Sequence, residues 1–290
     1  MSKRNREFTE SKYDKWLKEG RGQGEGGNYK PWINIQDVPS KGRSTRVMGI
    51  KSGRQHQFLS DMETNYFYIL EYLGCVYDIR EQYPLLSIEQ TLHIADEIGI
   101  NHHTDPKSKE KIVITTDFLI TVSKKEKNYL IARTIKSANE LNNLRVLEKF
   151  EIERRYWEKK EVDWGIVTEN EINKTFSENI KIIHPFYRLV DKEVFYGYSD
   201  IEISEFSNKF KERIIGNKIN IRKSAKQFDE DMMLKHGSSI ALFKHLLITK
   251  QIHIDLYRPL NIDMDMDVSI NNVFGSETYE QISCEYCYGV

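Results

Sequence analysis

Asp117 is a charged residue inside an otherwise apolar, β-branched segment, residues 111–122. Burying a carboxylate in such a strand is costly unless a partner or a metal ion compensates its charge. Nineteen residues later, Lys136 ends a second, mostly apolar segment that begins at Tyr129. If the two segments pair as a hairpin, the Asp and the Lys converge at one end of a sheet. Metal-dependent cleavage of a phosphodiester needs such a pair: carboxylates hold Mg²⁺, the metal acidifies a water, and a lysine orients that water.

A second carboxylate usually stands two residues before the lysine in such sites, and that position is Thr134 here. Glu63, in a predicted helix that precedes the sheet, is the natural replacement. Structural interpretations stay open for all three residues. Ser60 to Glu63 form a capping-box pattern, so Glu63 has a possible role in helix capping alone. Asp117 is also compatible with a water-facing edge strand, and Lys136 with a solvated strand end.

The elements that position these residues can be predicted from hydrophobic periodicity and from turn residues. The expected order is a helix at 9–18, a glycine-rich connector at 19–27, a basic hairpin at 41–56, a helix at 60–73, an extended segment at 76–86, a loop at 93–110, strands at 111–122 and 129–136, a helix at 139–160 and a strand at 164–168. This order describes an α/β domain with a mixed sheet flanked by helices, which we place at residues 1–170.

The remaining residues, 171–290, have a different pattern. Residues 171–250 are mostly helical in periodicity, and residues 251–257 then alternate as a strand that 268–270 can join. Helices followed by a β-ribbon predict a small winged-helix-like C-terminal domain.

Charge is unevenly distributed along the chain. The whole sequence has a net charge of −1, yet residues 1–60 carry thirteen Lys or Arg and only six Asp or Glu. A basic region of this kind suits contact with a phosphate backbone. The candidate DNA-binding residues are the basic ones of the predicted hairpin: Arg43, Arg46, Lys51 and Arg54.

The bulk composition excludes two broad classes of protein. No apolar run approaches the roughly 20 residues that a membrane-spanning helix needs, so we expect no membrane partner. Three cysteines, an odd number, do not suggest a disulfide scaffold, and a reducing cytoplasm is the expected location.

Three other motifs carry metal-ligand residue types. Cys284 and Cys287 have the spacing of half a zinc site, but no second pair exists. His102 and His103 lie in a predicted loop without a partner motif, which favours a solvated loop. Residues 263–267 begin like a calcium loop but lack its later Gly and Glu, so that interpretation fails.

Several stretches, in order over roughly residues 8–175, resemble the TnsA family, the endonuclease subunits of heteromeric transposases. These stretches are 18–24, 31–32, 38–40, 42–44, 59–63, 78–86, 116–119 and 147–157. The resemblance implies a restriction-endonuclease-like catalytic domain followed by a winged-helix-like domain. It implies an enzyme that cuts the 5′ strands at transposon ends during cut-and-paste transposition.

The family's catalytic Glu, Asp and Lys match Glu63, Asp117 and Lys136. The resemblance implies that Mg²⁺, with Mn²⁺ as a substitute, is held by Glu63, Asp117 and the Ile135 carbonyl. The family usually has Gln at position 134, so Thr134 is a departure whose role stays open.

The implied partners are double-stranded DNA at the transposon ends, a TnsB-like DDE transposase for the 3′ strands, and a TnsC-like AAA+ regulator docked on the C-terminal domain. Two rival functions remain: a stand-alone nuclease of the same fold, and a non-catalytic adaptor that joins regulator and transposase.

Overall fold

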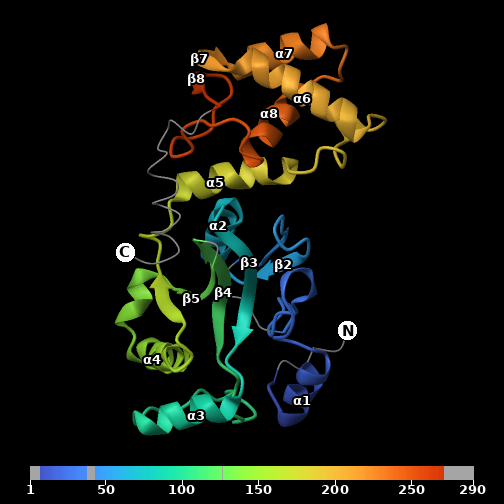
Figure 1. Cartoon of the computed structure of the whole chain (residues 1–290). Coiled ribbons are helices and arrows are strands. Elements are labelled where there is room, and N and C mark those ends of the chain that lie inside the picture. The colour runs from blue at the N-terminus through green and yellow to red at the C-terminus, as the bar shows by residue number, and fades with distance from the viewer. Residues whose placement is uncertain (1–6, 38–42, 126, 271–290) are drawn as a thin grey trace. The chain divides into compact units, whose positions relative to one another are not determined.

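The structure is a computed structural model that describes residues 7–37, 43–125 and 127–270. The chain divides into two compact units, whose described residues are 7–172 and 173–270. We call them the N-terminal unit and the C-terminal unit, and each is described by itself (Figure 1).

A four-stranded mixed sheet forms the centre of the N-terminal unit, in the order β3 (Val76–Pro84), β4 (Thr115–Lys124), β5 (Lys127–Ile135) and β6 (Asp163–Val167). β3, β4 and β5 are antiparallel neighbours, and β6 joins β5 in parallel. A parallel strand needs a crossover connection, and α4 (Leu144–Glu158) supplies it. The predicted mixed α/β sheet flanked by helices is therefore confirmed.

One face of the sheet is covered by α2 (Asp61–Tyr72) and by the hairpin of β1 (Thr45–Met48) and β2 (Gln55–Phe58). Aromatic rings join these layers. Phe118 of β4 lies 5.5 Å from Tyr66 of α2 and 5.9 Å from Phe58 of β2, between ring centroids. Because Phe118, Phe58 and Tyr66 are all fully buried, this packing fixes the height of α2 over β4.

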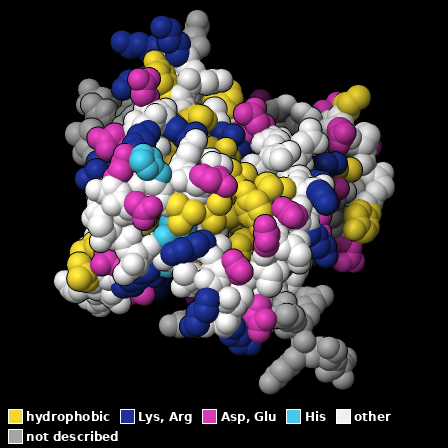
Figure 2. Space-filling view, turned by 90° about the horizontal axis from the view of Figure 1, so that it is seen from below, with side chains coloured by type: hydrophobic (Ala, Val, Ile, Leu, Met, Phe, Trp, Pro, Cys, Tyr) yellow, Lys and Arg dark blue, Asp and Glu magenta, His cyan; other side chains and the backbone are white. Residues whose placement is uncertain are grey.

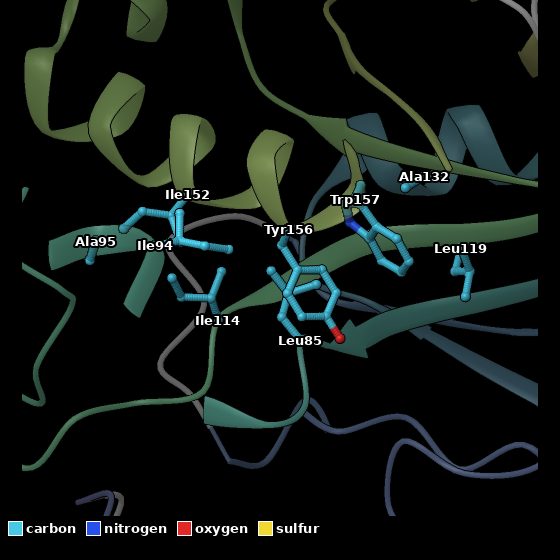
Figure 3. Packing of buried hydrophobic residues seen from close by; sticks show 9 residues of the cluster. All are labelled: Leu85, Ile94, Ala95, Ile114, Leu119, Ala132, Ile152, Tyr156 and Trp157. Carbon is cyan, nitrogen blue, oxygen red and sulfur yellow. The ribbon is translucent and has the colours of Figure 1, made fainter. Parts of the chain in front are cut away.

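Leu119 and Ala132, on neighbouring strands, belong to a second buried layer, under α4 and α3 (Ile88–Glu97) (Figure 3). Trp157 of α4 packs in this cluster, and its indole N–H donates to the Thr116 hydroxyl at 2.8 Å. The aromatic end of this helix, Tyr156 and Trp157, therefore belongs to the core. The cluster holds α4 on the sheet, and α4 also contributes side chains to the candidate site. Its buried members are Leu85, Ile94, Ala95, Ile114, Leu119, Ala132, Ile152, Tyr156 and Trp157.

The N-terminal helix α1 (Glu10–Lys18) is capped by Thr9, whose side chain accepts from the Lys12 amide. Trp16 of α1 packs edge-on against Trp32, with ring centroids 5.2 Å apart. The glycine-rich connector that follows passes close to the end of β3. A Cβ atom at Gly22, where φ is +75°, would lie 2.3 Å from the Pro84 side chain, so only glycine fits there.

Two sequence-based expectations for this unit were wrong in part. Residues 88–97 form the helix α3, although residues 93–97 were expected in a loop. The buried side chains of α3 are Thr91, Ile94 and Ala95, at helical spacing, and the polar residues between them hid that pattern. The long helix expected at 139–160 is a 3₁₀ turn, Ala138–Asn142, followed by α4, which Asn143 caps.

The C-terminal unit is mainly helical. Its helices are α5 (Lys174–Ile183), α6 (Asp200–Ile214), α7 (Ile221–Asp231) and α8 (Ser238–Ile248), and β7 (Gly216–Asn220) pairs with β8 (Asp265–Val268). Asn179 of α5 binds the backbone of the segment after α8, donating to the carbonyls of Leu256 and Arg258. The strand expected at 251–257 is reduced to one bridge, between His253 and Ser269, because β8 pairs with β7 instead.

Seen from below in the orientation of Figure 1, the surface shows a central group of hydrophobic side chains with acidic and basic side chains interspersed around it (Figure 2). Charge alone therefore does not mark this face as a phosphate-binding surface. Within the described residues, no helix is long and apolar enough to span a membrane.

Candidate active site

Glu63 lies in the first turn of α2, where local hydrogen bonds fix its carboxylate. The Ser60 hydroxyl donates to one oxygen at 2.8 Å, and the Leu59 amide donates to the other at 3.0 Å. Ser60 also caps the helix by accepting from the Glu63 amide at 3.1 Å. Glu63 therefore helps to order the start of α2 and still presents a buried carboxylate toward the sheet.

Asp117 of β4 reaches the same place from the sheet. Its Oδ2 accepts from the Ile135 amide of β5 at 2.7 Å, which fixes the carboxylate between the two strands. Its Oδ1 lies 3.3 Å from the Gln82 side-chain nitrogen, and the same nitrogen lies 3.5 Å from Glu63 Oε2. One amide of β3 thus spans both carboxylates, and the sequence-predicted Glu–Asp pair is brought together.

The electrostatics of this pair are unfavourable in the absence of a cation. Burial and the adjacent charge of Asp117 raise the pKa of Glu63 to about 7. Burial also raises the pKa of Asp117, against the opposing effect of nearby Lys149. Neighbouring buried carboxylates with raised pKa values are typical of functional sites.

Lys136 follows β5 directly and continues the pairing with β6 by donating its amide to the Val167 carbonyl at 3.0 Å. Its charge is among those that favour the ionised form of Asp117 and so lower the pKa of that carboxylate. Its ammonium group is 3.0 Å from Glu140 Oε1 in the 3₁₀ turn. The lysine therefore lies at the expected end of the sheet, with Glu140 as the partner of its side chain.

Thr134 contacts a carboxylate that the sequence-based reasoning did not single out. The Thr134 hydroxyl donates to Glu153 Oε2 at 2.6 Å, and the Lys149 ammonium lies 3.3 Å from Glu153 Oε1. Glu153 is fully buried, and burial raises its pKa against the effect of Lys149. Position 134 thus lacks a carboxylate of its own but holds one that comes from α4.

The residues present fit a divalent cation. Glu63 and Asp117 supply oxygen ligands of the type that Mg²⁺ prefers, and a positive charge between them would offset their repulsion. Glu153 adds a third buried carboxylate, whose Oε1 lies 3.3 Å from the Lys149 ammonium. Among the described residues, no group of three or more His, Cys, Asp or Glu side chains is arranged as a metal site by itself. The observed contact of Ile135 with Asp117 is through its amide, so the predicted carbonyl ligand stays a prediction.

The four candidate DNA-binding residues differ in their surroundings. Arg43 and Arg46 are exposed, as a phosphate contact requires. Lys51 donates to the carbonyls of Leu73 and Val76, at 2.8 and 2.6 Å. Arg54 makes hydrogen bonds to Glu81 and to the Ile79 carbonyl within the N-terminal unit.

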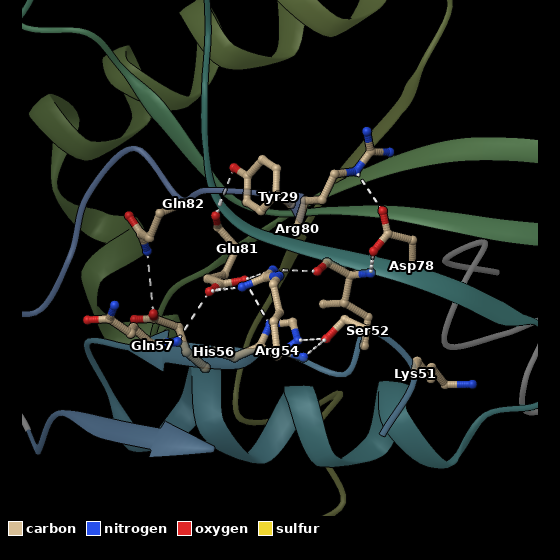
Figure 4. A network of polar contacts seen from close by, with 12 residues as sticks. Tyr29, Lys51, Ser52, Arg54, His56, Gln57, Asp78, Arg80, Glu81 and Gln82 are labelled. Carbon is tan, nitrogen blue, oxygen red and sulfur yellow. Dashed lines mark hydrogen bonds and ion pairs between the residues drawn. The ribbon is translucent and has the colours of Figure 1, made fainter. Parts of the chain in front are cut away.

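Arg54 belongs to a buried network around Glu81 of β3 (Figure 4). Its guanidinium group donates to both Glu81 oxygens, at 2.8 and 2.5 Å, and to the Ile79 carbonyl. His56, bonded to Ser52 at 2.7 Å, lies 2.8 Å from the same carboxylate. These contacts occupy Arg54 in holding the β1–β2 hairpin on the sheet, which speaks against a role in contacting DNA.

Within the part of the chain that the structure describes, the other motifs are not brought together as metal sites. His102 contacts Thr91 at 2.9 Å and the His103 carbonyl at 3.1 Å, so it packs the loop onto α3. Residues 265–267 belong to the strand β8. Cys284 and Cys287 lie outside the described residues.

Three residues of the site escaped the sequence-based reasoning: Gln82, Lys149 and Glu153. Glu153 had a usable signal, because it lies three and four residues before the core residues Tyr156 and Trp157 and so shares their helix face. Lys149 follows from Glu153 by the same helical spacing. Gln82 had none, since a polar residue in the strand before a proline has many possible roles.

The chain is similar in sequence to known proteins. Residues 74–169 match the family model described as TnsA-like endonuclease N terminal, and residues 171–256 match that described as TnsA endonuclease C terminal. The chain is 35% identical over 283 residues to the transposon Tn7 transposition protein TnsA of Escherichia coli, covering 98% of this chain and all of that protein.

Proposed function

We propose, from the premise that this chain belongs to the TnsA family of transposition endonucleases, that it hydrolyses the 5′ strands at transposon ends with a divalent metal bound by Glu63 and Asp117. Mg²⁺ is the proposed metal, and Mn²⁺ a substitute. The main support for this proposal is that the buried carboxylates of Glu63 in α2 and Asp117 in β4 both contact the side-chain amide of Gln82 in β3.

The roles of the residues follow from where they lie. A bound Mg²⁺ would supply a Lewis acid for the phosphate and lower the pKa of a water ligand. Glu63 and Asp117 are placed to hold it, with the Ile135 carbonyl as a further proposed ligand. Lys136 is placed to orient the attacking water or to stabilise developing negative charge, once its side chain leaves Glu140. Glu153, held by Thr134 and by Lys149, adds a third buried carboxylate near Asp117.

The active complex is proposed to include other proteins. A TnsB-like DDE transposase would recognise the ends and cut the 3′ strands, and a TnsC-like AAA+ regulator would dock on the C-terminal unit. The order α6, β7, α7, α8, β8 supports a winged-helix-like interpretation of that unit, which we assign to residues 171–290. Arg43 and Arg46, which are exposed, are the proposed DNA contacts near the catalytic domain, assigned to residues 1–170.

Strand-specific cleavage tests this proposal. Glu63→Ala, Asp117→Ala and Lys136→Ala proteins, combined with the transposase and the regulator on DNA carrying transposon ends, should leave the 5′ strands uncut. A Glu97→Ala protein, altered on the exposed face of α3, should cut normally. Normal cutting by the Asp117→Ala protein would contradict the proposal. Cutting of bare DNA by the wild-type chain alone would instead indicate a stand-alone nuclease.

A further inference from the structure

The Gln82 side chain contacts both carboxylates that are proposed to bind the metal. Its amide nitrogen lies 3.3 Å from Asp117 Oδ1 and 3.5 Å from Glu63 Oε2. Its amide oxygen accepts from the Thr115 hydroxyl at 3.3 Å, which sets which end of the amide faces the carboxylates. The Gln82 side chain is buried, so water does not readily replace these contacts.

The backbone of Gln82 is also unusual. Its φ is +49°, in the left-handed region that non-glycine residues rarely adopt, although it lies within the strand β3. Its carbonyl oxygen accepts from the Trp32 amide at 3.2 Å, which holds this conformation. Backbone strain of this kind is concentrated at functional sites, where the surroundings enforce it. Both the side chain and the backbone thus point to a fixed task for this amide.

We propose that Gln82 is a positioning residue for the metal: its amide nitrogen bridges Glu63 and Asp117 and holds their carboxylates in register for a divalent cation. The bridge offsets part of the repulsion between the two acids before the cation arrives, and the cation then takes over that role. Residues that orient metal ligands in this way typically contribute 10–100-fold to metal affinity. The inference rests on the proposed function, because it assumes that this pair binds the metal.

A purely structural role is the competing explanation, and Gln57 of β2 provides the matched control. Gln57 also uses both ends of its amide, donating to Asn34 at 2.9 Å and accepting from the Ile35 amide at 3.1 Å. Neither of its side-chain partners is a proposed metal ligand. Replacing either glutamine removes amide contacts from the N-terminal unit, three at Gln82 and two at Gln57, but only Gln82 should change metal binding.

The test is a calorimetric titration of the full-length chain with Mn²⁺, without DNA or partner proteins. Gln82→Met removes the amide and keeps the length of the side chain, and it should bind Mn²⁺ about 10–100-fold more weakly than the wild type. Gln57→Met should bind as the wild type does. Thr115→Val removes only the hydroxyl that orients the amide, so its loss of affinity should be smaller but in the same direction.

The outcomes separate the two proposals. If the wild type binds Mn²⁺ and both Gln82→Met and Thr115→Val, checked for folding by circular dichroism, bind it equally well, the role of Gln82 is refuted and the metal site stands. If Gln82→Met fails to fold, Thr115→Val decides alone. If the wild type itself binds no Mn²⁺, the proposed metal-dependent function fails, and the positioning role fails with it.

Discussion

Glu81 and Glu63 are two buried carboxylates of the same unit with opposite surroundings. Glu81 has a guanidinium group and an imidazole as direct partners, and despite burial these hydrogen bonds and charges lower its pKa to about 2. Glu63 has a second acid as its neighbour, and burial together with that neighbour raises its pKa to about 7. The residue that follows Glu81 in β3, Gln82, contacts the Glu63 pair, so one strand takes part in both arrangements.

The difference distinguishes buried charges that stabilise the fold from buried charges that serve catalysis. A carboxylate that is fully paired stabilises one arrangement of the elements, as Glu81 does for the β1–β2 hairpin. A pair of acids that lacks a cation costs folding free energy and persists because the site needs it. Altering each group should therefore have opposite effects on stability and on activity, which the following variants test.

The largest expected effect is on cleavage by Asp117→Asn. Removing one of the two carboxylates should lower the rate of 5′-strand cutting by at least about 10³-fold, since a bound metal contributes several kcal/mol of charge stabilisation in the transition state. The free energy of unfolding without metal should stay the same or rise, because the repulsion with Glu63 disappears. Gel assays of cleavage and urea unfolding measure the two quantities. A loss of both activity and stability would mean that the pair has a structural role.

Glu81→Gln should have the opposite effects to Asp117→Asn: stability should fall and metal binding should stay the same. It leaves the buried Arg54 without a counter-charge, which should lower the free energy of unfolding by about 3–5 kcal/mol. Binding of Mn²⁺ by the folded variant should be unchanged, since the metal pair does not contact Glu81 directly. Urea unfolding and metal titration give the two results, with Glu97→Gln as the exposed control that should change stability little. Loss of metal affinity at full stability would overturn the distinction between the two regions.

Glu63 and Glu81 should also make contributions to folding stability that depend on pH in opposite ways. The folded pKa of Glu63, about 7, lies above its value of roughly 4.3 in the unfolded chain. Between those values the folded state binds more protons, so this group's contribution to stability is lost as pH rises, by about 3 kcal/mol. The pKa of Glu81, about 2, is lowered, so its contribution is present above roughly pH 4.3 and is lost as pH falls toward 2.

Glu63→Gln isolates the first of these contributions. The free energy of unfolding of this variant, relative to the wild type, should rise by about 3 kcal/mol between pH 5 and pH 8, with both proteins free of metal. Urea unfolding at each pH provides the comparison. A difference that does not change with pH would show that Glu63 is ionised throughout and that its charge is already compensated.

Thr134→Val should have the smallest effect of the set. It removes the hydroxyl that donates to Glu153 at 2.6 Å but keeps the shape of the side chain. Loss of a hydrogen bond to a buried carboxylate should cost about 2 kcal/mol of stability. Thermal and urea unfolding measure this cost. An unchanged stability would show that Thr134 does not anchor Glu153. The presence of Thr at position 134, where the family usually has Gln, would then have no structural explanation.

Much of the N-terminal fold was predictable because local patterns and tertiary structure agree there. The apolar strands around Asp117 and the capping pattern at Ser60 led to β4 and α2 at nearly their observed positions. α3 was missed because its buried face is narrow and partly polar, with Thr91 inside it. In the C-terminal unit, the expected pairing of residues 251–257 with 268–270 is reduced to the bridge between His253 and Ser269. The pairing of β8 with β7 was missed because it depends on distant residues, which periodicity does not reveal.

The candidate site was predictable only in part. Asp117 and Lys136 followed from the strands, but Glu63 gained its role from resemblance to a family. Gln82 and Glu153 depend on which strand and which helix face meet in three dimensions, and a linear pattern carries that information weakly. Arg54 shows the converse: a basic residue at a predicted turn is occupied by a buried acid that lies 27 residues further along the chain.

The most direct measurement of the central claim is the position of the metal itself. Crystals of the chain soaked in Mn²⁺ should give an anomalous peak between the Glu63 and Asp117 carboxylates, about 2.0–2.2 Å from an oxygen of each, as expected for a hard divalent cation. The peak should be absent from crystals of Asp117→Asn treated in the same way. A peak at another cluster of side chains, or none in the wild type while cleavage proceeds, would contradict the account.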